Sequence, residues 1–503
     1  MNIMQAEMID PIQNLHNVDS ELVVGLVGAI GTDLSRVSEI LDAQLRRMGY
    51  DVVHVKISGQ VIPLFGTVVF NENDECDRVR NLMHAGNEAR RKSKDNSILA
   101  LGAATLIASS RSLPQTPQYQ KAFIVNSLKR PEEVERLRQI YSSGFVLLGV
   151  HAEEARRIEE LCSKDIQTVD AKLLIERDSK ENIVPHGQRL EDTFYLSDFF
   201  VKLDGNDDLL KSEIRRITEL LFGHPFHTPS FDEYAMFFAF AAALRSADLS
   251  RQVGAVIARD SQILATGAND CPKAGGGLYW PERDELGRLT DFPNGRDFTR
   301  GIDSNKKEQK AIIDKIVELG ERRGIPPNEL RDVLSSKESP IGDLTEYGRV
   351  VHAEMDALTS CARNHLSPKE ATLYCTTFPC HNCAKHILAA GIKRVVFIEP
   401  YEKSKAFDFH QDSVLFDAQS SNADKAQFEP FFGIGPRKFF DLFSMKLSSG
   451  YDVVRSDKKT GVKFDWKHDE ARLRLQMLPL TYLDLELQAA ELFQKLRGDH
   501  ADE

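Results

Sequence analysis

Apolar runs that fit β-strands alternate with stretches of helical spacing along most of this 503-residue chain, and this alternation restricts its fold more than any other feature. The first run, 21–27, leads through the glycine-containing turn 28–32 into a helix-period stretch at 34–48, and a second run follows at 51–57. A strand, a turn with glycines, a helix and another strand make a βαβ unit, with which doubly wound parallel sheets begin. The amino-terminal part is therefore predicted to be an α/β domain.

Further strand-like runs extend this first domain. They lie at 98–101, 122–126 and 145–150, and a helix is predicted at 131–141 between the last two. A segment with two prolines, 223–229, then interrupts the pattern before a new helix begins. The sequence therefore places one doubly wound domain at 1–222.

A second alternation of helices and strands predicts a second α/β domain at 226–455. Its elements are expected at 232–247 (helix), 254–258 and 263–267 (strands), 352–362 (helix), 372–377 (strand), 380–390 (helix) and 394–398 (strand). The polar stretch 272–346 is too long for an ordinary loop, and we interpret it as a functional insertion with a helix at 306–319. Residues 456–503 have apolar residues at helical spacing and are predicted to form a helical extension that docks on an unidentified surface.

Composition and charge exclude several classes of protein. With 42% apolar and 28% charged residues the chain can form folded cores, and its net charge of −12 disfavours a non-specific nucleic-acid binder, although local basic patches stay open. The longest apolar stretch, 234–244, is shorter than the roughly 20 residues of a membrane span, and the first ten residues lack the features of a secretory signal. We therefore expect a cytoplasmic protein with no membrane partner, whose seven cysteines are reduced.

Three residues of the second domain have the spacing of zinc ligands. His352-Ala-Glu354 opens one predicted helix, and Pro379-Cys380-His-Asn-Cys383 opens the next after an intervening strand, so both helices direct their amino ends to one place. One imidazole and two thiolates leave the fourth position of a tetrahedral Zn²⁺ open to water, as catalytic zinc requires, and zinc bound in this way lowers the pKa of water toward about 7. Glu354 need not bind the metal, and we predict that it is the catalytic acid and base that carries protons.

The combined pattern H-x-E…P-C-x-x-C is typical of the zinc deaminases of cytosine and adenine. A structural zinc knuckle and a redox-active C-x-x-C pair are the alternatives, but neither needs the His-x-Glu element or the helix–strand–helix context. The same tripeptide also occurs at His151-Ala-Glu153, where no P-C-x-x-C follows and Cys162 stands alone. We interpret this other copy as an exposed helix start.

With this motif in place, residues 230–400 resemble the deoxycytidylate-type deaminases. The segments R-S-A-D-L-S-R-Q-V-G-A-V-I, 245–257, and I-L-A-T-G-A-N, 263–269, are similar to the first helix and hairpin of that family. The resemblance implies a cytidine-deaminase-like α/β/α sandwich in which Asn269 contacts the nucleotide sugar, whereas an ordinary turn asparagine is the alternative. No His or Cys occurs between Cys271 and His352, so we expect the second, structural zinc site of the family pattern to be absent.

The whole arrangement resembles the bacterial anti-phage dCTP deaminases, because a nucleotide-kinase-like domain precedes the deaminase and Gly433-Ile-Gly-Pro436-Arg437 follows it. This resemblance covers most of the chain. It implies that the chain converts free deoxycytidine nucleotides, dCTP and also dCMP, to the deoxyuridine nucleotides and ammonia, which depletes dCTP in antiviral defence. It also implies an inhibitory antitoxin RNA, of which the sequence itself shows nothing, and we expect a homo-oligomer.

The glycine-containing turn of the first domain departs from a phosphate-binding P-loop. In the pattern G-x-x-x-x-G-K-[ST], counted from Gly28, the last three positions are Asp33, Leu34 and Ser35, so the lysine is missing and a carboxylate stands where phosphate would bind. We therefore expect no ATP hydrolysis in this degenerate, P-loop-like domain, which we interpret as regulatory or as a scaffold. A nucleotide could still bind weakly through the turn residues Gly28, Gly31, Thr32 and Ser35. The alternative is a tight turn with Asp33 as the helix cap.

The choice of substrate rests on the resemblance and on charge. Zinc and Glu354 indicate hydrolytic deamination, and the segment 245–269 favours cytosine over adenine by resemblance only. A chain of net charge −12 repels a polynucleotide unless a dedicated channel exists, whereas one triphosphate needs only a few cations. We hypothesise that Arg245 or Arg251 clamps the phosphates together with some of the insertion residues Lys273, Arg296, Arg300, Lys306 and Lys307. A polynucleotide deaminase, a dCMP deaminase of pyrimidine biosynthesis and a catalytically idle zinc protein are the alternatives.

Overall fold

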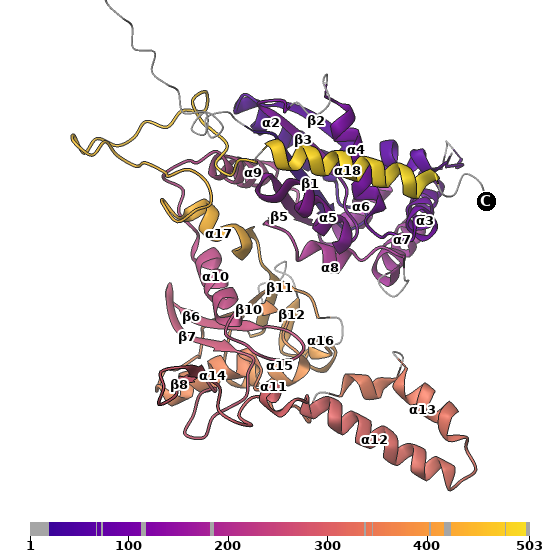
Figure 1. Ribbon diagram of the computed structural model, residues 1–503, viewed down its shortest axis with the longest axis vertical. Coiled ribbons are helices and arrows are strands. Elements are labelled where there is room, and N and C mark those ends of the chain that lie inside the picture. The colour runs from indigo at the N-terminus through magenta and orange to yellow at the C-terminus, as the bar shows by residue number, and fades with distance from the viewer. Residues whose placement is uncertain are drawn as a thin grey trace, which may run out of the picture. The chain divides into compact units, whose positions relative to one another are not determined.

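The computed structural model describes residues 20–66, 68–71, 74–111, 117–181, 186–336, 339–344, 346–401, 404–416, 424–477 and 479–498. The chain divides into two compact units, Met1–Ser230 together with Phe432–Glu503, and Phe231–Phe431 (Figure 1). This division differs from the boundaries expected from the sequence, because 432–455 was expected in the second domain and belongs to the first unit.

The first unit is a doubly wound α/β domain, as the sequence predicted. Its sheet has, within the described part of the chain, six strands in the order β14-β5-β4-β1-β3-β2. They are β1 (Leu22–Gly28), β2 (Asp51–Lys56), β3 (Lys121–Asn126), β4 (Phe145–His151), β5 (Phe199–Lys202) and β14 (Gly433–Ile434). Strands β1 to β5 are parallel, whereas β14 pairs with β5 in antiparallel fashion, with Ile434 opposite Phe199. This pairing explains why the segment after Phe431 joins the first unit.

Helices cover both faces of this sheet (Figure 1). Alternate residues of β1 point to two separate cores. On one face, Val24 packs with α2 (Leu34–Arg47) and α9 (Asp207–Leu221). On the other face, Val23 packs with α4 (Ile98–Ser109), α5 (Pro131–Tyr141) and α18 (Pro479–Gly498). The other helices of the unit are α3 (Glu75–Ser93), α6 (Glu154–Cys162), α7 (Thr168–Lys180), α8 (Leu190–Phe194), α17 (Pro436–Phe443) and the short η1 (Ile57–Val61), η2 (Ile62–Phe65) and η3 (Ser142–Gly144).

One expected strand of the first unit is wrong. The run 98–101 opens the helix α4, whose residues Ile98 to Ala104 are all buried between the sheet and α18. A helix that is covered on all sides is apolar all round, so its sequence lacks the polar face that would identify it as a helix.

The C-terminal helix α18 is the predicted extension, and it packs on α4. Phe493 is fully buried against Gly102, where an added Cβ would lie 3.0 Å from the ring. Arg111, beyond the end of α4, forms ion pairs with Glu486 of α18 and with Glu21 at the start of β1, and its Nε lies 2.9 Å from a Glu21 oxygen. The helix therefore docks on the first unit through both apolar and buried charged contacts.

The second unit is a three-layer α/β/α sandwich, as the resemblance implied. Its sheet has six strands among the described residues, in the order β12-β13-β11-β10-β6-β7. They are β6 (Gly254–Arg259), β7 (Gln262–Ala268), β10 (Thr372–Thr377), β11 (Arg394–Glu399), β12 (Val414–Phe416) and β13 (Ala426–Pro430). β6 is antiparallel to β7 and β10, whereas β10, β11, β13 and β12 run parallel.

Two helices approach this sheet closely on opposite faces. Helix α10 (Phe231–Ala243) crosses β6 at Gly254, where an added Cβ would lie 1.9 Å from the Ala239 carbonyl oxygen. Helix α14 (Ala353–Arg363) crosses β7 at Gly267, where an added Cβ would lie 2.1 Å from the Ala353 oxygen. Gly267 therefore fixes the depth at which α14, and with it the predicted His352 ligand, lies on the sheet, and Gly254 does the same for α10.

The insertion 272–346 forms structure of its own. It contains the hairpin β8 (Glu282–Arg283) and β9 (Leu289–Thr290) and the helices α11 (Asp297–Arg300), α12 (Ser304–Glu321), α13 (Pro327–Ser335) and η5 (Pro340–Asp343). The helix expected at 306–319 lies within α12, which pairs with α13 as a helical hairpin (Figure 1). The remaining helices of the unit are α15 (His381–Ala389) and α16 (Ala406–Phe409). Among the described residues, no helix is long and apolar enough to cross a membrane.

Candidate active site

The amino ends of α14 and α15 meet at the edge of the sandwich and bring the predicted metal ligands together. His352 is the residue before α14, and Cys380 is the residue before α15 with Cys383 in its first turn. The imidazole Nδ1 of His352 lies 3.3 Å from the Sγ atom of each cysteine. The three donor atoms therefore face a common point.

This arrangement fits a zinc ion. Bond lengths of about 2.3 Å to sulfur and 2.0–2.1 Å to nitrogen give a tetrahedral N–S edge of about 3.5 Å, close to the observed separation. Hydrogen bonds from Cys383 and His352 lower the pKa of Cys380 to about 4, so this thiol ionises readily. The hydrogen bond to Cys380 raises the pKa of His352 to about 9, so metal binding displaces a proton from the imidazole.

Glu354 lies in the first turn of α14, one residue after Ala353, and its side chain is buried with 4% exposed. Burial, the largest influence, raises the pKa of its carboxyl group above the ordinary value. Glu354, His352 and Cys380 line one cavity of about 190 Å³. A buried carboxyl group with a raised pKa, beside a metal site and open to a cavity, is suited to take up and return a proton.

Arg251 and Asn269 also line this cavity. The Arg251 guanidinium lies over the Tyr401 ring, 4.8 Å from its centroid. The Asp248 carboxylate holds the loop of Arg251, because it accepts hydrogen bonds from the backbone N–H groups of Ser250 and Arg251 at 2.9 and 3.1 Å. Asn269 accepts from the Val253 N–H at 2.7 Å and donates to the Arg251 carbonyl at 2.8 Å. The side-chain amide of Asn269 therefore fixes the loop that carries Arg251, which is the role expected of an ordinary turn asparagine. A contact with the nucleotide sugar would use the second N–H of the Asn269 amide.

The structure does not place Arg245 in this cavity. Its guanidinium stacks on Trp280, 3.9 Å from the ring centroid, and donates to the Tyr279 carbonyl oxygen. It belongs to another surface hollow, formed by α10, β7 and α14. The stacking partner lies in the insertion, so the position of Arg245 could not be read from its own segment.

The insertion cations do not line the cavity either, contrary to our hypothesis. Lys273 pairs with Glu282 at 2.7 Å, Arg296 pairs with Asp270 and Asp291 at 3.2 Å, and Arg300 donates to the Asn294 carbonyl. Lys306 donates to Gln309 at 3.0 Å, and Lys307, likewise on α12, is exposed. Nearby acidic and polar groups of the insertion already engage most of these cations, so they are not aimed at a ligand.

Sequence reasoning missed several residues of the cavity wall. The insertion contributes Asp297, Asp303 and Asn305, the first residue of α15 contributes His381, and the loop after β11 contributes Tyr401. Asp303 caps α12 by accepting from the Asn305 N–H at 2.7 Å, which its position before a helix could have indicated. The position of that helix end at the active site depends on the path of the insertion, for which the sequence carries no signal.

Another group of metal-binding side chains lies in the first unit, at Glu219, His224 and His227. The Glu219 carboxylate is within 2.6 Å of His227 Nε2 and 3.4 Å of His468 Nε2, and His224 Nδ1 accepts from the Phe226 N–H at 3.3 Å. The Glu219 carboxylate is thus already engaged by two histidines, and no H-x-E…P-C-x-x-C pattern accompanies this group. We therefore expect one zinc per chain, at His352, Cys380 and Cys383.

The glycine-containing turn of the first unit is built as a tight βα turn. Asp33 accepts from the Arg36 N–H at 3.0 Å and caps α2, as predicted for a helix cap. Gly31 has a φ of +81°, and an added Cβ there would lie 2.6 Å from the Arg157 carbonyl oxygen. The conformation of Gly31 and the close approach of α6 therefore explain this glycine without a phosphate.

The comparison with known proteins agrees with this geometry. Residues 229–399 match the family described as cytidine and deoxycytidylate deaminase zinc-binding region, so the expectation of Zn²⁺ as the cofactor is confirmed. The deoxycytidylate deaminase of Enterobacteria phage T4 is 33% identical over 169 residues, which cover 33% of this chain and 77% of that protein.

Solved structures match parts of this chain at low identity. The dCMP deaminase of the cyanophage S-TIM5, in complex with dCMP and dUMP, is 19% identical with a TM-score of 0.23, and the match covers 41% of this chain and 99% of that one. A putative kinase from Chloroflexus aurantiacus is 12% identical with a TM-score of 0.23, and covers 39% of this chain and 98% of its own.

Proposed function

The chain belongs to the deoxycytidylate deaminase family, and we propose that it removes the amino group of free deoxycytidine nucleotides, dCTP and also dCMP, to give the deoxyuridine nucleotide and ammonia. The observation that carries this proposal is the buried Glu354 carboxyl group on one cavity wall with His352 and Cys380, with Cys383 Sγ 3.3 Å from His352 Nδ1. A metal-binding or sensor protein would need the three ligands but not a buried acid at this position.

The residues of the site divide the work of a hydrolytic deamination. Zinc, when bound, supplies a Lewis acid that makes water acidic enough to react near neutral pH. Cys380 and Cys383 hold the metal as thiolates, and His352 holds it as a neutral imidazole. Glu354 accepts a proton from the attacking water and passes it to the cytosine ring nitrogen N3. It then takes the proton of the new C4 hydroxyl and gives it to the amine, which leaves as ammonia while the C4 carbonyl forms.

The cavity wall favours a free nucleotide over a polynucleotide. Asp248, Asp297 and Asp303 lie on the wall, and their carboxylates repel the repeated phosphates of a polynucleotide backbone. Arg251 is the guanidinium that the described wall offers, and we assign it the α-phosphate that dCTP and dCMP share. Asn269 is then placed to contact the sugar through its remaining N–H.

The resemblance to the bacterial anti-phage dCTP deaminases extends the proposal to the biological role. In this role the chain lowers the dCTP pool during phage infection, acts as a homo-oligomer and is held inactive by an antitoxin RNA. The dCTP pool of infected cells that carry the wild-type chain is expected to fall below that of cells with Glu354→Gln. Equal pools in both would assign the chain to pyrimidine biosynthesis or another role.

The substrate class is tested by ammonia release from zinc-loaded protein. We expect release from dCTP, and also from dCMP, and none above background from single-stranded DNA or RNA that contains cytosine. Ready release from a polynucleotide while dCTP and dCMP stay intact would replace the proposed function with that of a polynucleotide deaminase.

A further inference from the structure

A cavity of about 390 Å³ lies in the first unit, at the carboxyl ends of β1, β2 and β3. Ile30 follows β1, Lys56 ends β2 and Asn126 ends β3, and all three line it. In doubly wound sheets, ligands bind at this edge, beside the strand at which the strand order reverses, and here that strand is β1. The cavity volume falls within the range of small-molecule sites, about 300–1,000 Å³.

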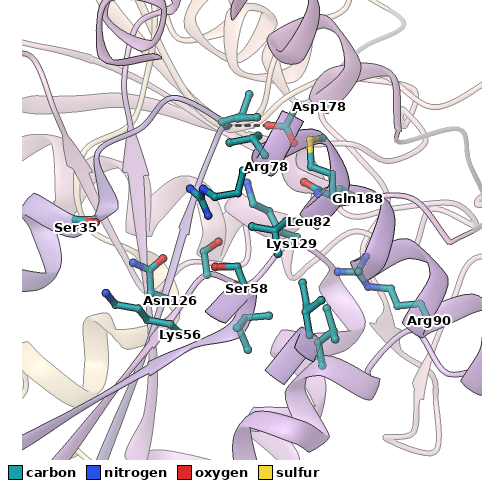
Figure 2. A pocket seen from close by; sticks show the side chains of 18 residues that line it. Ser35, Lys56, Ser58, Arg78, Leu82, Arg90, Asn126, Lys129, Asp178 and Gln188 are labelled. Atoms are coloured by element: carbon teal, nitrogen blue, oxygen red, sulfur yellow. Dashed lines mark hydrogen bonds between the residues drawn. The ribbon is translucent and has the colours of Figure 1, made fainter. Parts of the chain in front are cut away.

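One side of the cavity is cationic. Figure 2 places Lys56, with Ser35 and Asn126, on one side of the cavity, and Arg78 and Lys129 nearer its middle. Within the described residues the Lys56 ammonium has no ion-pair partner, while Lys129 donates one of its three N–H groups to the Gly28 carbonyl at 2.9 Å. This side therefore offers unused positive charge in a chain whose net charge is −12.

The opposite side carries buried hydrogen-bond acceptors (Figure 2). Asp178 is 2% exposed; one carboxylate oxygen accepts from the Ile30 N–H at 2.8 Å, and the other has no partner in the described part of the chain. Gln188 is 6% exposed, and its side-chain oxygen is likewise unpartnered among those residues. Buried acceptors without a donor are costly, so a ligand with N–H or O–H groups would satisfy both.

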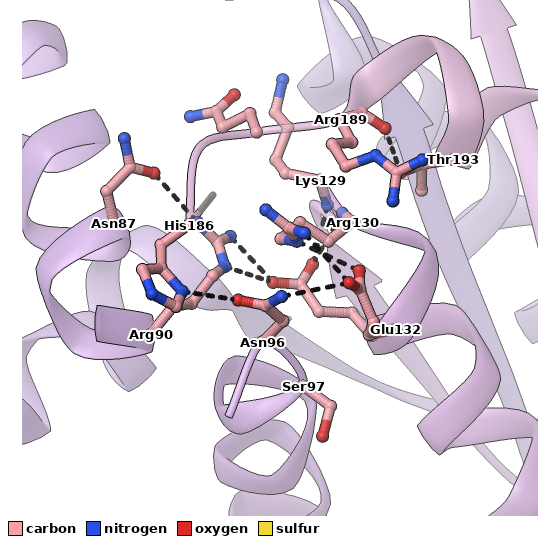
Figure 3. Close-up of polar contacts among 12 residues, drawn as sticks. Asn87, Arg90, Asn96, Ser97, Lys129, Arg130, Glu132, His186, Arg189 and Thr193 are labelled. Carbon is pink, nitrogen blue, oxygen red and sulfur yellow. Dashed lines mark hydrogen bonds and ion pairs between the residues drawn. The ribbon is translucent and has the colours of Figure 1, made fainter. Parts of the chain in front are cut away.

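A polar network beside the cavity holds the backbone near Lys129 in place (Figure 3). The buried Arg90 donates to one Glu133 oxygen at 2.8 and 3.2 Å, and the other Glu133 oxygen accepts from the backbone N–H of Lys129 at 2.8 Å. Arg130 donates to the Gly187 carbonyl, next to Gln188. The backbone at Lys129 and at Gly187, next to Gln188, is thus held before any ligand arrives, which lowers the entropic cost of binding.

The remaining wall is apolar and suits a flat ring. Its apolar residues are Ile57, Ile62, Val79, Leu82, Met83 and Leu99. A ligand with an anionic group for the lysine side, a flat ring for the apolar wall and hydrogen-bond donors for the acceptor side is a nucleotide. We propose that this cavity binds a nucleoside 5′-phosphate, with the phosphate toward Lys56 and the base or sugar donors toward Asp178 and Gln188.

The proposed ligand position differs from that of a P-loop. The Asp33 carboxylate caps α2 and keeps phosphate away from the helix end, and Leu34 replaces the lysine that would activate a triphosphate. The cavity therefore binds its nucleotide without hydrolysing it. Of the four turn residues expected to bind a nucleotide, Ser35 lines this cavity.

The test measures binding in the first unit of the full, zinc-loaded chain. Trp466 lies in the first unit and Trp280 in the second, so Trp280→Phe makes tryptophan fluorescence report thermal unfolding of the first unit. The midpoint is recorded with AMP, GMP, dCMP, dTMP, adenosine and inorganic phosphate. At least one nucleoside monophosphate is expected to raise the midpoint at millimolar concentration, and adenosine and phosphate alone are expected to have less effect.

Variants then locate the site. Lys56→Glu and Gln188→Leu are expected to weaken nucleotide binding at least tenfold, and Gln188→Leu keeps the midpoint of the unliganded protein. The matched control is Lys92→Glu, an exposed residue of α3, which is expected to leave binding unchanged. Absence of any midpoint shift, equal binding of inorganic phosphate, or unchanged binding by Lys56→Glu would each overturn the proposal. Loss of deaminase activity has no bearing on it.

Discussion

Replacing Arg111 with methionine is expected to destabilise the first unit strongly. The Arg111, Glu21 and Glu486 side chains are 2%, 0% and 1% exposed, so the substitution leaves two carboxylates buried without their counter-ion. Removal of one partner from such a buried group costs about 3–5 kcal/mol. A whole domain is stable by only about 5–15 kcal/mol, so Arg111→Met removes a large share of the stability of the unit.

The pH dependence of this loss has a definite sign. Burial raises the pKa of Glu486, and Arg111 opposes that rise. Without Arg111 the pKa of Glu486 in the folded chain rises further above its unfolded value. The destabilisation caused by Arg111→Met is then small at a pH below the pKa of Glu486 in the unfolded chain. It grows as the pH increases toward and through the raised pKa of Glu486 in the folded chain. Arg111→Met is therefore expected to lose more stability, relative to wild type, at pH 8 than at pH 5.

Urea unfolding followed by Trp466 fluorescence in the Trp280→Phe background measures the effect. The matched control is Arg91→Met, because Arg91 pairs with Glu88 at the surface with 60% of its side chain exposed, where solvent screens the pair and it contributes little to stability. If Arg111→Met costs no more than Arg91→Met, or if its loss shrinks between pH 5 and pH 8, the interpretation of the buried charges is refuted.

Three further predictions concern both units. Cys383→Ser should lose zinc and activity together, since it removes a ligand, whereas Cys162→Ser should keep both; full zinc content by mass spectrometry in Cys383→Ser would remove the site assignment. Arg251→Glu should raise KM for dCMP and dCTP at least tenfold more than KM for deoxycytidine, whereas Arg288→Glu, at an exposed residue, should not. Equal KM changes for the nucleotides and for deoxycytidine in Arg251→Glu would exclude a phosphate contact. Burial raises the pKa of Glu213 to about 7, above its unfolded value, so the stability of the first unit should fall as the pH rises from 6 to 8. Glu213→Gln should flatten this dependence. The same change of melting temperature with pH in Glu213→Gln as in the wild type would contradict this prediction.

The zinc centre could be predicted from the sequence because its geometry is local. Each ligand sits at the amino end of a helix, and helix–strand–helix order brings those ends together with few alternatives. His352, Cys380 and Cys383 therefore carry their spatial relationship in their spacing along the chain. The same reasoning gave the capping role of Asp33, since one residue and its helix suffice to determine it.

Contacts between distant segments could not be predicted in this way. Arg245 stacks on Trp280, and the insertion cations pair with acids whose proximity depends on the path of a long polar segment. The run that begins at Ile98 has the same apolar composition in a buried helix as in a buried strand. The surface covered by α18 depends on Phe493 meeting Gly102, which a single sequence does not record.

The most direct test of the account combines activity and metal content of Glu354→Gln. Glutamine keeps the shape of the buried side chain but cannot carry the proton, and general acid–base catalysis contributes about 10²–10⁴-fold to rate. We predict that purified Glu354→Gln contains one zinc per chain, as the wild type does, and that its kcat for release of ammonia from dCTP or dCMP falls by at least about 100-fold. Near-normal turnover in this variant, or a wild-type protein that releases no ammonia from either nucleotide, would contradict the central claim.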